Sequence, residues 1–119
     1  MSMDKKLFNC NVELALDIIR GKWKPLIICQ IGANENIRYG ELKRKIPNIN
    51  ERVLTRQLRE LEDNKIIERK TYEGAVLKVE YYLTDTGKSL TPTLLELGQW
   101  GKQYNEKFQY GEVNLKQIG

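Results

Sequence analysis

The sequence contains no histidine and only two cysteines, and these shortages exclude several kinds of site at once. Without histidine, neither a Ser-His-Asp triad nor a Cys-His pair can form. Cys10 and Cys29, nineteen residues apart, match no spacing used by zinc sites. The phosphate-binding motifs GxGxxG and GxxxxGK[ST] are both missing. We therefore predict that the protein is not an enzyme and uses no metal or other cofactor.

Long apolar runs are missing as well. No stretch approaches the roughly 20 residues that a membrane-spanning helix needs, and the N-terminal residues MSMDKKLFNC lack the apolar segment of a secretory signal. The 119 residues are enough to bury one core. A composition of 40% hydrophobic and 30% charged residues is typical of a globular domain. We expect a cytoplasmic protein with no membrane partner.

Positive charge is concentrated in one part of the chain. The net charge is +4, and the segment 38–70 holds 10 basic and 6 acidic residues. The remaining segments hold 10 of each, so the whole excess lies between Arg38 and Lys70. A local excess of this kind is what binding to a polyanion requires, because neutralised phosphates release their counterions.

The segment 50–64 lies inside this basic region and has the pattern of an amphipathic helix. Leucines recur on one side at helical spacing, and Asn50 is a suitable N-cap. The opposite side presents three guanidinium groups and a hydroxyl, from Arg52, Thr55, Arg56 and Arg59. Arginine can grip a phosphate, or O6 and N7 of guanine, with two parallel hydrogen bonds. A solvated face with charge pairs along the helix is the alternative for a helix taken alone.

The residues before this helix predict a helix-turn-helix. We expect a helix over 12–20 that is capped by Asn11, and an almost wholly apolar helix over 22–32 that belongs in the core. A very short strand over 36–39 and a helix over 39–46 follow, and Pro47 stops that helix. Two helices joined by a short turn, the second with an exposed basic face, are the pattern of a helix-turn-helix.

The residues after the basic helix change to the period of strands. Segments 66–72 and 76–83 are rich in β-branched and aromatic residues, and the turn 73–75 separates them. They predict a β-hairpin directly after the helix-turn-helix, which is the position of a wing. Lys70 and Lys78 are expected near its tip, where they can reach a DNA backbone or minor groove.

The last helix is expected to begin at Thr84 or Asp85 and to be interrupted or restarted at Pro92. Beyond the proline an apolar stripe either packs against its own domain or forms a dimer interface, and we favour the interface. The stripe consists of Leu94, Leu97, Trp100, Gly101 and Tyr104. Residues 1–9 and 109–119 are expected to be terminal tails around a single domain over 10–108.

Taken together, these elements predict a mainly α fold with a small β-hairpin (α+β), a winged helix-turn-helix with flanking N- and C-terminal helices. The chain resembles the HxlR-type winged helix-turn-helix transcriptional regulators of the MarR-like group. The residues that match are Cys10 before helix 12–20, Gly21-Lys22-Trp23, Arg38-Tyr39 with Glu41-Leu42, Pro47-Asn48-Ile49, Arg52-Val53-Leu54 with Leu58-Arg59-Glu60-Leu61-Glu62, Val79-Glu80-Tyr81 with Leu83-Thr84 and Gly87, and Trp100-Gly101.

The resemblance implies a homodimeric, sequence-specific DNA-binding regulator whose first and last helices form the dimer. In that arrangement helix 50–64 enters the major groove of double-stranded DNA, and the operator is a pseudo-palindrome with half-sites about 34 Å apart or a multiple of that. We expect base contacts from three residues of that helix, a phosphate contact from a fourth and backbone contacts from three lysines. They are Arg52, Thr55 and Arg56, then Arg59, and then Lys43, Lys70 and Lys78.

The resemblance also bears on the cysteines and on the wing. Some family members sense oxidants or electrophiles through a cysteine at the position of Cys10. A thiol just before a helix is favoured as its reactive thiolate, and Lys5 and Lys6 could assist; an inert structural thiol is the alternative. Cys29 is expected to be buried. The family's wing tip often carries prolines, whereas here it reads Glu73-Gly74-Ala75, which predicts a more mobile wing.

Two rival functions remain open at this point. A winged helix can serve as a protein–protein interaction module without binding DNA, although such a helix would more commonly present an apolar or acidic face than a row of arginines. A redox switch that acts mainly through disulfide chemistry at Cys10 is the second rival. The sequence locates no apolar pocket for a small-molecule effector.

Overall fold

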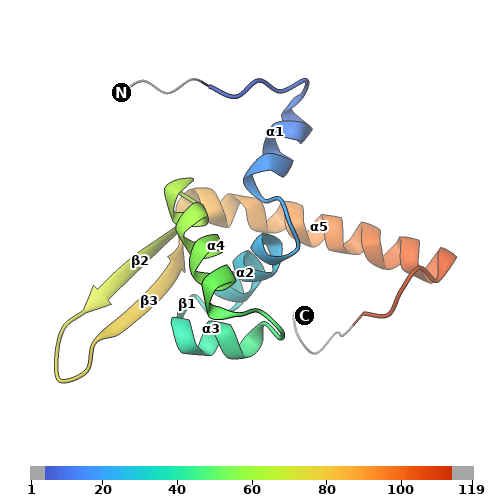
Figure 1. The fold of residues 1–119 in the computed structure, drawn as a ribbon. Coiled ribbons are helices and arrows are strands. Elements are labelled where there is room, and N and C mark those ends of the chain that lie inside the picture. The colour runs from blue at the N-terminus through green and yellow to red at the C-terminus, as the bar shows by residue number, and fades with distance from the viewer. Residues whose placement is uncertain (1–4, 114–119) are drawn as a thin grey trace.

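The computed structural model describes residues 5–113, and this part of the chain folds into five helices and a three-stranded antiparallel sheet (Figure 1). The fold class is the one predicted, a winged helix-turn-helix. The elements follow one another as α1 (Asn11–Ile18), α2 (Trp23–Ala33), β1 (Asn36–Arg38), α3 (Tyr39–Lys45), α4 (Glu51–Asp63), β2 (Ile67–Tyr72), β3 (Lys78–Leu83) and α5 (Asp85–Phe108).

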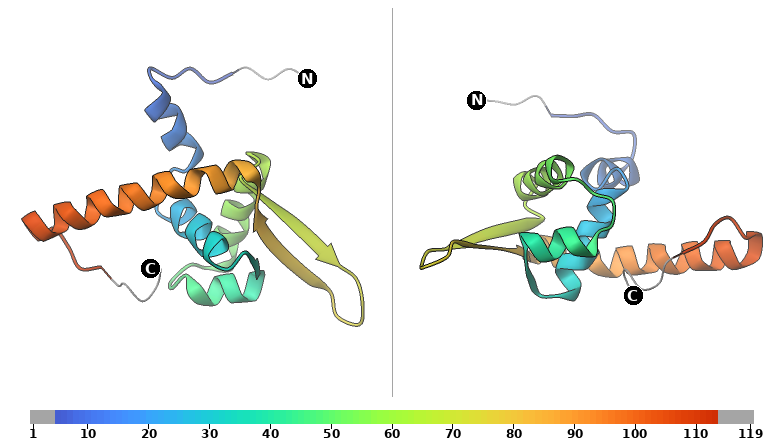
Figure 2. Two further views of the ribbon diagram at one scale, coloured as in Figure 1. Left: turned by 180° about the vertical axis from the view of Figure 1, so that it is seen from behind. Right: turned by 60° about the horizontal axis from the view of Figure 1, so that its bottom comes forward.

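Helix α2 is the central element, because the sequence gives it almost no polar surface. Ile27, Ile28 and Ile31 are fully buried. Helices α3 and α4 lie on one side of α2 and α5 lies on the other, so the helices form layers with α2 in the middle (Figures 1 and 2). The same core includes Leu42 and Ile46 from α3, Leu54, Leu58 and Leu61 from α4, Ile37, Ile67, Tyr81 and Leu83 from the sheet, and Leu94 from α5.

The helix-turn-helix follows the sequence pattern closely. Helix α3 ends before Pro47, and Asn48 adopts a left-handed conformation (φ 70°) within the connection. Asn50 caps α4 as predicted, since its side-chain oxygen accepts a hydrogen bond of 2.9 Å from the backbone N–H of Val53. The Asn50 cap fixes where α4 begins, and the buried leucines fix which of its faces points outward.

The sheet has the strand order β1-β3-β2, and β2 and β3 project from the body as a hairpin (Figure 1). Tyr81 pairs with Ile37 on one side and Arg69 on the other. The second strand begins at Lys78 rather than at residue 76, because Lys78 forms the last pair with Tyr72. Val76 and Leu77 therefore lie in the exposed tip of the wing instead of continuing the inward-facing row.

Helix α5 runs without a break from Asp85 to Phe108, so the expected interruption at Pro92 is wrong. Pro92 lies on the exposed side of the helix, where the carbonyl that loses its bond can face water. Leu90 and Leu94 pack against the core on the other side and hold the helix in register across the proline. The start of α5 is capped by Thr84, whose hydroxyl oxygen accepts a bond of 3.0 Å from the Gly87 N–H.

Helix α1 makes far less use of its apolar residues than the sequence indicates. It ends at Ile18, it contains no buried residue, and Cys10 rather than Asn11 occupies its N-cap position. Val12 and Leu16 are exposed, and Ile19, just after the helix, is the residue that enters the core. Helix α1 and the end of α5 both stand out from the body of the molecule (Figure 2).

The structure describes only part of the expected terminal tails. Residues 1–4 and 114–119 lie outside the described residues. Beyond α5, however, the Asn105 side chain both donates to the carbonyl and accepts from the N–H of Gly111, each at 2.8 Å. The chain at 109–113 therefore folds back onto the end of α5. Within residues 5–113, no helix combines the length and the apolar character needed to cross a membrane.

Candidate nucleic-acid interface

The outward face of α4 is the centre of the candidate interface. Arg52, Arg56 and Arg59 are exposed, and they lie opposite the leucines that enter the core. Among residues 5–113, none of these three guanidinium groups has an acidic partner within 4.0 Å. The folded chain thus presents three arginines in one row, without ion pairs of their own, which disfavours the alternative of a helix face satisfied by charge pairs.

Thr55, which shares this face with the three arginines, is held in place by Tyr39. This role of Tyr39 was not predicted from the sequence. Its hydroxyl lies 3.3 Å from the Thr55 Oγ1 and donates to the Glu51 carbonyl at 3.4 Å. Tyr39 is the first residue of α3, so these bonds join the two helices of the helix-turn-helix. The only sequence signal was an aromatic residue with a polar end placed at the start of the preceding helix.

An ion pair between a buried lysine and a partly exposed glutamate holds α4 against α2. Lys24 is 4% exposed, and its Nζ lies 2.5 Å from the Glu60 Oε1. The hydrogen bond from Lys24 lowers the pKa of Glu60 against the opposing effect of burial, and the positive charges of Lys24, Arg56 and Arg20 add to it. This pair was also missed from the sequence. A lysine within an otherwise apolar helix was the available signal, because a buried charge requires a partner.

Basic residues of α3 lie beside α4. Lys43, predicted to contact DNA backbone, is half-buried, whereas Arg44 and Lys45 in the same turn are exposed. Arg38 and Arg44 line an open hollow of about 460 Å³ together with Gly40 and Glu41. Positive charge on α3 is therefore carried largely by residues that the sequence reading did not single out.

The two wing lysines lie over tyrosine rings on the outer face of the sheet. The Lys70 Nζ is 4.7 Å from the centroid of the Tyr82 ring, and the Lys78 Nζ is 4.8 Å from that of Tyr72. Lys78 also lies 3.6 Å from the Glu80 Oε2. No ion pair of this kind is present for Lys70 in the part of the chain that the structure describes. Glu80 thus neutralises part of the charge of Lys78, whereas the charge of Lys70 remains available to a ligand.

A chain of hydrogen bonds connects this face across all three strands. The Tyr82 hydroxyl donates to Glu80 Oε1 at 2.8 Å, and the hydroxyls of Tyr72 and Tyr82 are 2.8 Å apart. Asn36 on β1 donates to the same Glu80 oxygen at 3.2 Å. The bond to Tyr82, with burial and the negative charge of Glu80, raises the pKa of Tyr72 to about 12. The network joins the wing to β1 and opposes the mobility that was predicted for it.

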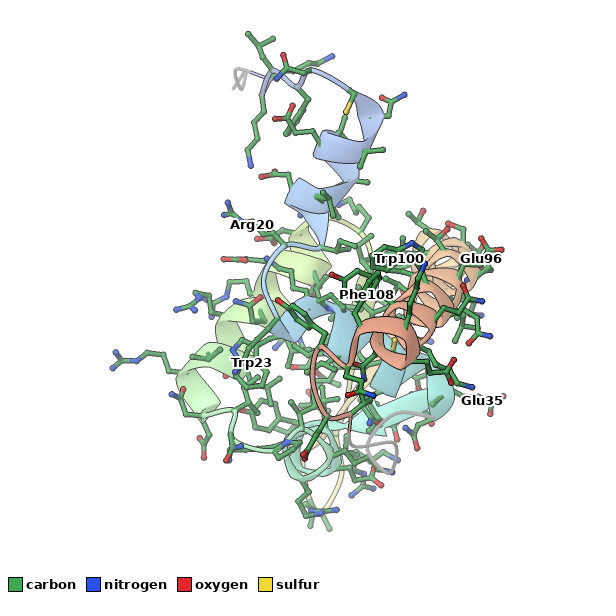
Figure 3. The ribbon with its side chains drawn as sticks, turned by 90° about the vertical axis from the view of Figure 1, so that its right-hand side faces the viewer. Arg20, Trp23, Glu35, Glu96, Trp100 and Phe108 are labelled. Carbon is green, nitrogen blue, oxygen red and sulfur yellow. The ribbon has the colours of Figure 1, made fainter. Side chains whose placement is uncertain are left out.

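The residues expected at a dimer interface fall into two groups. Leu94 is 8% exposed and belongs to the core of its own chain, so its assignment to an interface is wrong. Leu97 and Trp100 are exposed and Tyr104 is partly so, on the half of α5 that extends beyond the body. The rings of Trp100 and Tyr104 stack at 5.2 Å, and Phe108, which the sequence reading did not include, continues the row (Figure 3).

The cysteines have different surroundings. Cys10 is exposed at the start of α1. Lys6 is paired with Asp17 at 2.9 Å, and that hydrogen bond lowers the pKa of the Asp17 carboxyl, so Lys6 does not serve Cys10 as expected. Cys29 is half-buried rather than fully buried, and burial raises the pKa of its thiol. Of the two thiols, Cys10 is the accessible one.

A helix-turn-helix followed by a hairpin wing, with an exposed basic second helix, defines a winged helix-turn-helix protein of the kind that binds DNA. The sequence model described as HxlR-like helix-turn-helix matches residues 18–109. The chain therefore belongs to the HxlR-like helix-turn-helix family.

Individual relatives agree with this assignment. The chain is 46% identical over 95 residues to an HTH-type transcriptional regulator of Methanothermobacter thermautotrophicus, covering 80% of this chain and 72% of that one. It is 43% identical over 113 residues to the HTH-type transcriptional regulator YkvN of Bacillus subtilis, covering 94% and 95%. The reduced form of the redox regulator HypR superposes with a TM-score of 0.79 at 37% identity, covering 86% of this chain and all 100% of that one.

Proposed function

We propose that this protein is a cytoplasmic, homodimeric transcriptional regulator that binds a specific site on double-stranded DNA. The observation that carries the proposal is the row of exposed arginines on α4 without ion pairs of their own, backed by leucines that fix its orientation. The names of the relatives, which are transcriptional regulators, support the same conclusion.

In this proposal α4 lies in the major groove. Arg52, Thr55 and Arg56 read base edges, and Arg59 binds a phosphate, because these four side chains share the outward face. Lys43 on α3, together with the wing lysines, contacts the sugar-phosphate backbone. Base contacts supply specificity and backbone contacts supply position and most of the salt dependence.

The dimer is proposed to form through the exposed apolar residues of α5 and α1. Leu97, Trp100 and Tyr104 on α5, with Val12 and Leu16 on α1, are exposed in the single chain. A two-fold dimer presents two copies of α4, so the operator is expected to be a pseudo-palindrome whose half-sites lie about 34 Å apart, or a multiple of that.

A redox response is a second function supported by a specific observation, the exposed Cys10 at the start of α1. HypR, a structural neighbour at 37% identity, is a redox regulator. Two Cys10 thiols of a dimer would form a disulfide by passing two electrons and two protons to an oxidant such as hydrogen peroxide. The absence of a crosslink on a non-reducing gel, together with unchanged DNA binding after mild oxidation, would exclude this function.

The DNA-binding proposal is tested by fluorescence anisotropy on fragments of the protein's own upstream region and on a scrambled duplex, over a series of salt concentrations. We expect tight binding to one fragment and a steep loss of affinity with salt. If Arg56 reads a base, Arg56→Ala costs about 1–3 kcal/mol on that fragment and much less on the scrambled duplex. Lys102→Ala, on an exposed part of α5, is the control. Absence of binding at low salt would favour the protein-interaction alternative.

A further inference from the structure

A hollow lies between α4 and the segment 20–24, which contains the end of the α1–α2 connection and the start of α2. It has a volume of about 310 Å³, and its two walls come from segments far apart in the sequence. Arg20, Gly21, Trp23 and Lys24 form one wall, and Arg56, Gln57 and Glu60 of α4 form the other. Arg56 belongs to the proposed DNA-binding row, so the hollow adjoins that row directly.

The charges around the hollow are mostly positive. Its lining contains three cations and the single carboxylate of Glu60, which is already bonded to Lys24. Arg20 lies 3.7 Å from Asp17, but that carboxylate is held more closely by Lys6, at 2.9 Å. Besides the hydrogen bond from Lys24, the positive charges of Arg56 and Arg20 also lower the pKa of Glu60.

Lys22 adds a further cation to this edge. Its Nζ lies 4.5 Å from the centroid of the Trp23 ring, and Lys22 itself is exposed. Among residues 5–113 no acidic side chain lies within 4.0 Å of it. The connection turns at Gly21, whose φ of +87° is a conformation that favours glycine. Arg20 and Lys22 lie on either side of this turn.

The position of this edge relative to α4 indicates its ligand. In Figure 3, Arg20 and Trp23 lie on the side of the molecule that α4 occupies, whereas Trp100 and Phe108 lie with α5. A helix that enters the major groove is flanked by the phosphates of the groove walls, which side chains beside the helix contact to fix its register. A cationic edge beside α4 therefore faces the polyanion that α4 binds.

We propose that Arg20 and Lys22 form a second DNA-backbone site, which binds phosphates flanking the groove that α4 occupies. This inference rests on the proposed DNA-binding function and extends it to the α1–α2 connection. Arg20 takes the phosphate with its guanidinium group, and Lys22 acts as a point charge held against the Trp23 ring. The contact carries no base information, so it contributes affinity and register rather than sequence preference.

The test is the salt dependence of DNA binding by the full chain with Arg20→Gln and Lys22→Gln together. Each lost phosphate contact reduces the slope of log K against log salt by about 0.9, so we expect a reduction of about 1.8. The affinities for the upstream fragment and for the scrambled duplex should fall by the same factor. Lys88→Gln with Lys102→Gln, which removes the same charge from exposed positions on α5, is the matched control.

The outcomes separate the two proposals. If the unmodified protein binds neither duplex at low salt, both proposals fail. If it binds with a preference that Arg56→Ala removes, but the Arg20 and Lys22 variant has the slope of the control, only the second site is wrong. Arg20→Lys should keep the slope because it keeps the charge, which distinguishes a phosphate contact from a packing role of Arg20. Circular dichroism of each variant verifies that the fold is retained.

Discussion

The exposed leucines of α5 allow the proposed dimer interface to be tested with a matched pair of substitutions. Leu95 and Leu97 are 66% and 56% exposed in the single chain. They lie two positions apart on one helix, so their side chains point to opposite sides. Leu97 shares its side with Trp100 and Tyr104, whereas Leu95 does not. Leu97→Ser therefore changes the proposed interface, whereas Leu95→Ser makes the same chemical change away from it.

The size of the effect follows from the exposed area. Fully burying a leucine side chain contributes about 1.5–3 kcal/mol. Because Leu97 is 56% exposed before association, about half of this, roughly 0.8–1.5 kcal/mol, is available to the interface. A two-fold dimer contains the residue twice, which gives about 1.6–3 kcal/mol per dimer. The dissociation constant should rise by about 15- to 150-fold for Leu97→Ser and change little for Leu95→Ser.

Sedimentation velocity over a dilution series measures this difference directly. The unmodified protein and Leu95→Ser should dissociate over the same concentration range, and Leu97→Ser at clearly higher concentrations. Equal weakening by both substitutions would mean that α5 associates through a different face. No weakening by Leu97→Ser would remove α5 from the interface and leave α1 as the remaining surface.

Two further predictions concern the wing and the packing of α4. Lys70→Ala should lower the salt slope of DNA binding by about 0.9. Lys78→Ala should lower it by much less, because Glu80 lies 3.6 Å from Lys78. Equal salt slopes for the two variants would contradict this prediction. Lys24→Met should lower the free energy of unfolding in urea by about 1 kcal/mol at pH 7. The ionised Glu60 stabilises the fold above its ordinary pKa of 4.5 and loses this effect as the pH falls through its lowered pKa, so the two proteins should converge in acid.

The features that could be predicted from the sequence are those that local patterns determine. Helix α4, its Asn50 cap and its two faces follow from residues within four positions of one another, and the structure has them as predicted. The very short strand expected over 36–39 is present as β1, although Tyr39 begins α3 instead of ending the strand. The order of these elements was enough to predict the fold class.

The features that could not be predicted depend on which surfaces meet. The continuity of α5 through Pro92 depends on Leu90 and Leu94 finding the core, which no pattern within the helix reveals. Leu94 was predicted to lie at a dimer interface for a similar reason. An apolar stripe has the same spacing whether it packs against its own domain or against another chain. The Lys24–Glu60 pair joins residues 36 positions apart and required the packing of α2 on α4 to be known.

These tertiary contacts also limit how DNA binding could be regulated. Glu60 is bonded to α2, and Thr55 and the Glu51 carbonyl are bonded to Tyr39 of α3, so α4 is tied to the body of the domain at two places. In contrast, α1 contains no buried residue and the end of α5 extends beyond the body. In the proposed dimer, a signal received at Cys10 would therefore act by changing the distance and angle between two rigid domains. If the two copies of α4 in that dimer meet half-sites at a fixed spacing, a small change in this geometry would weaken binding without any unfolding of α4.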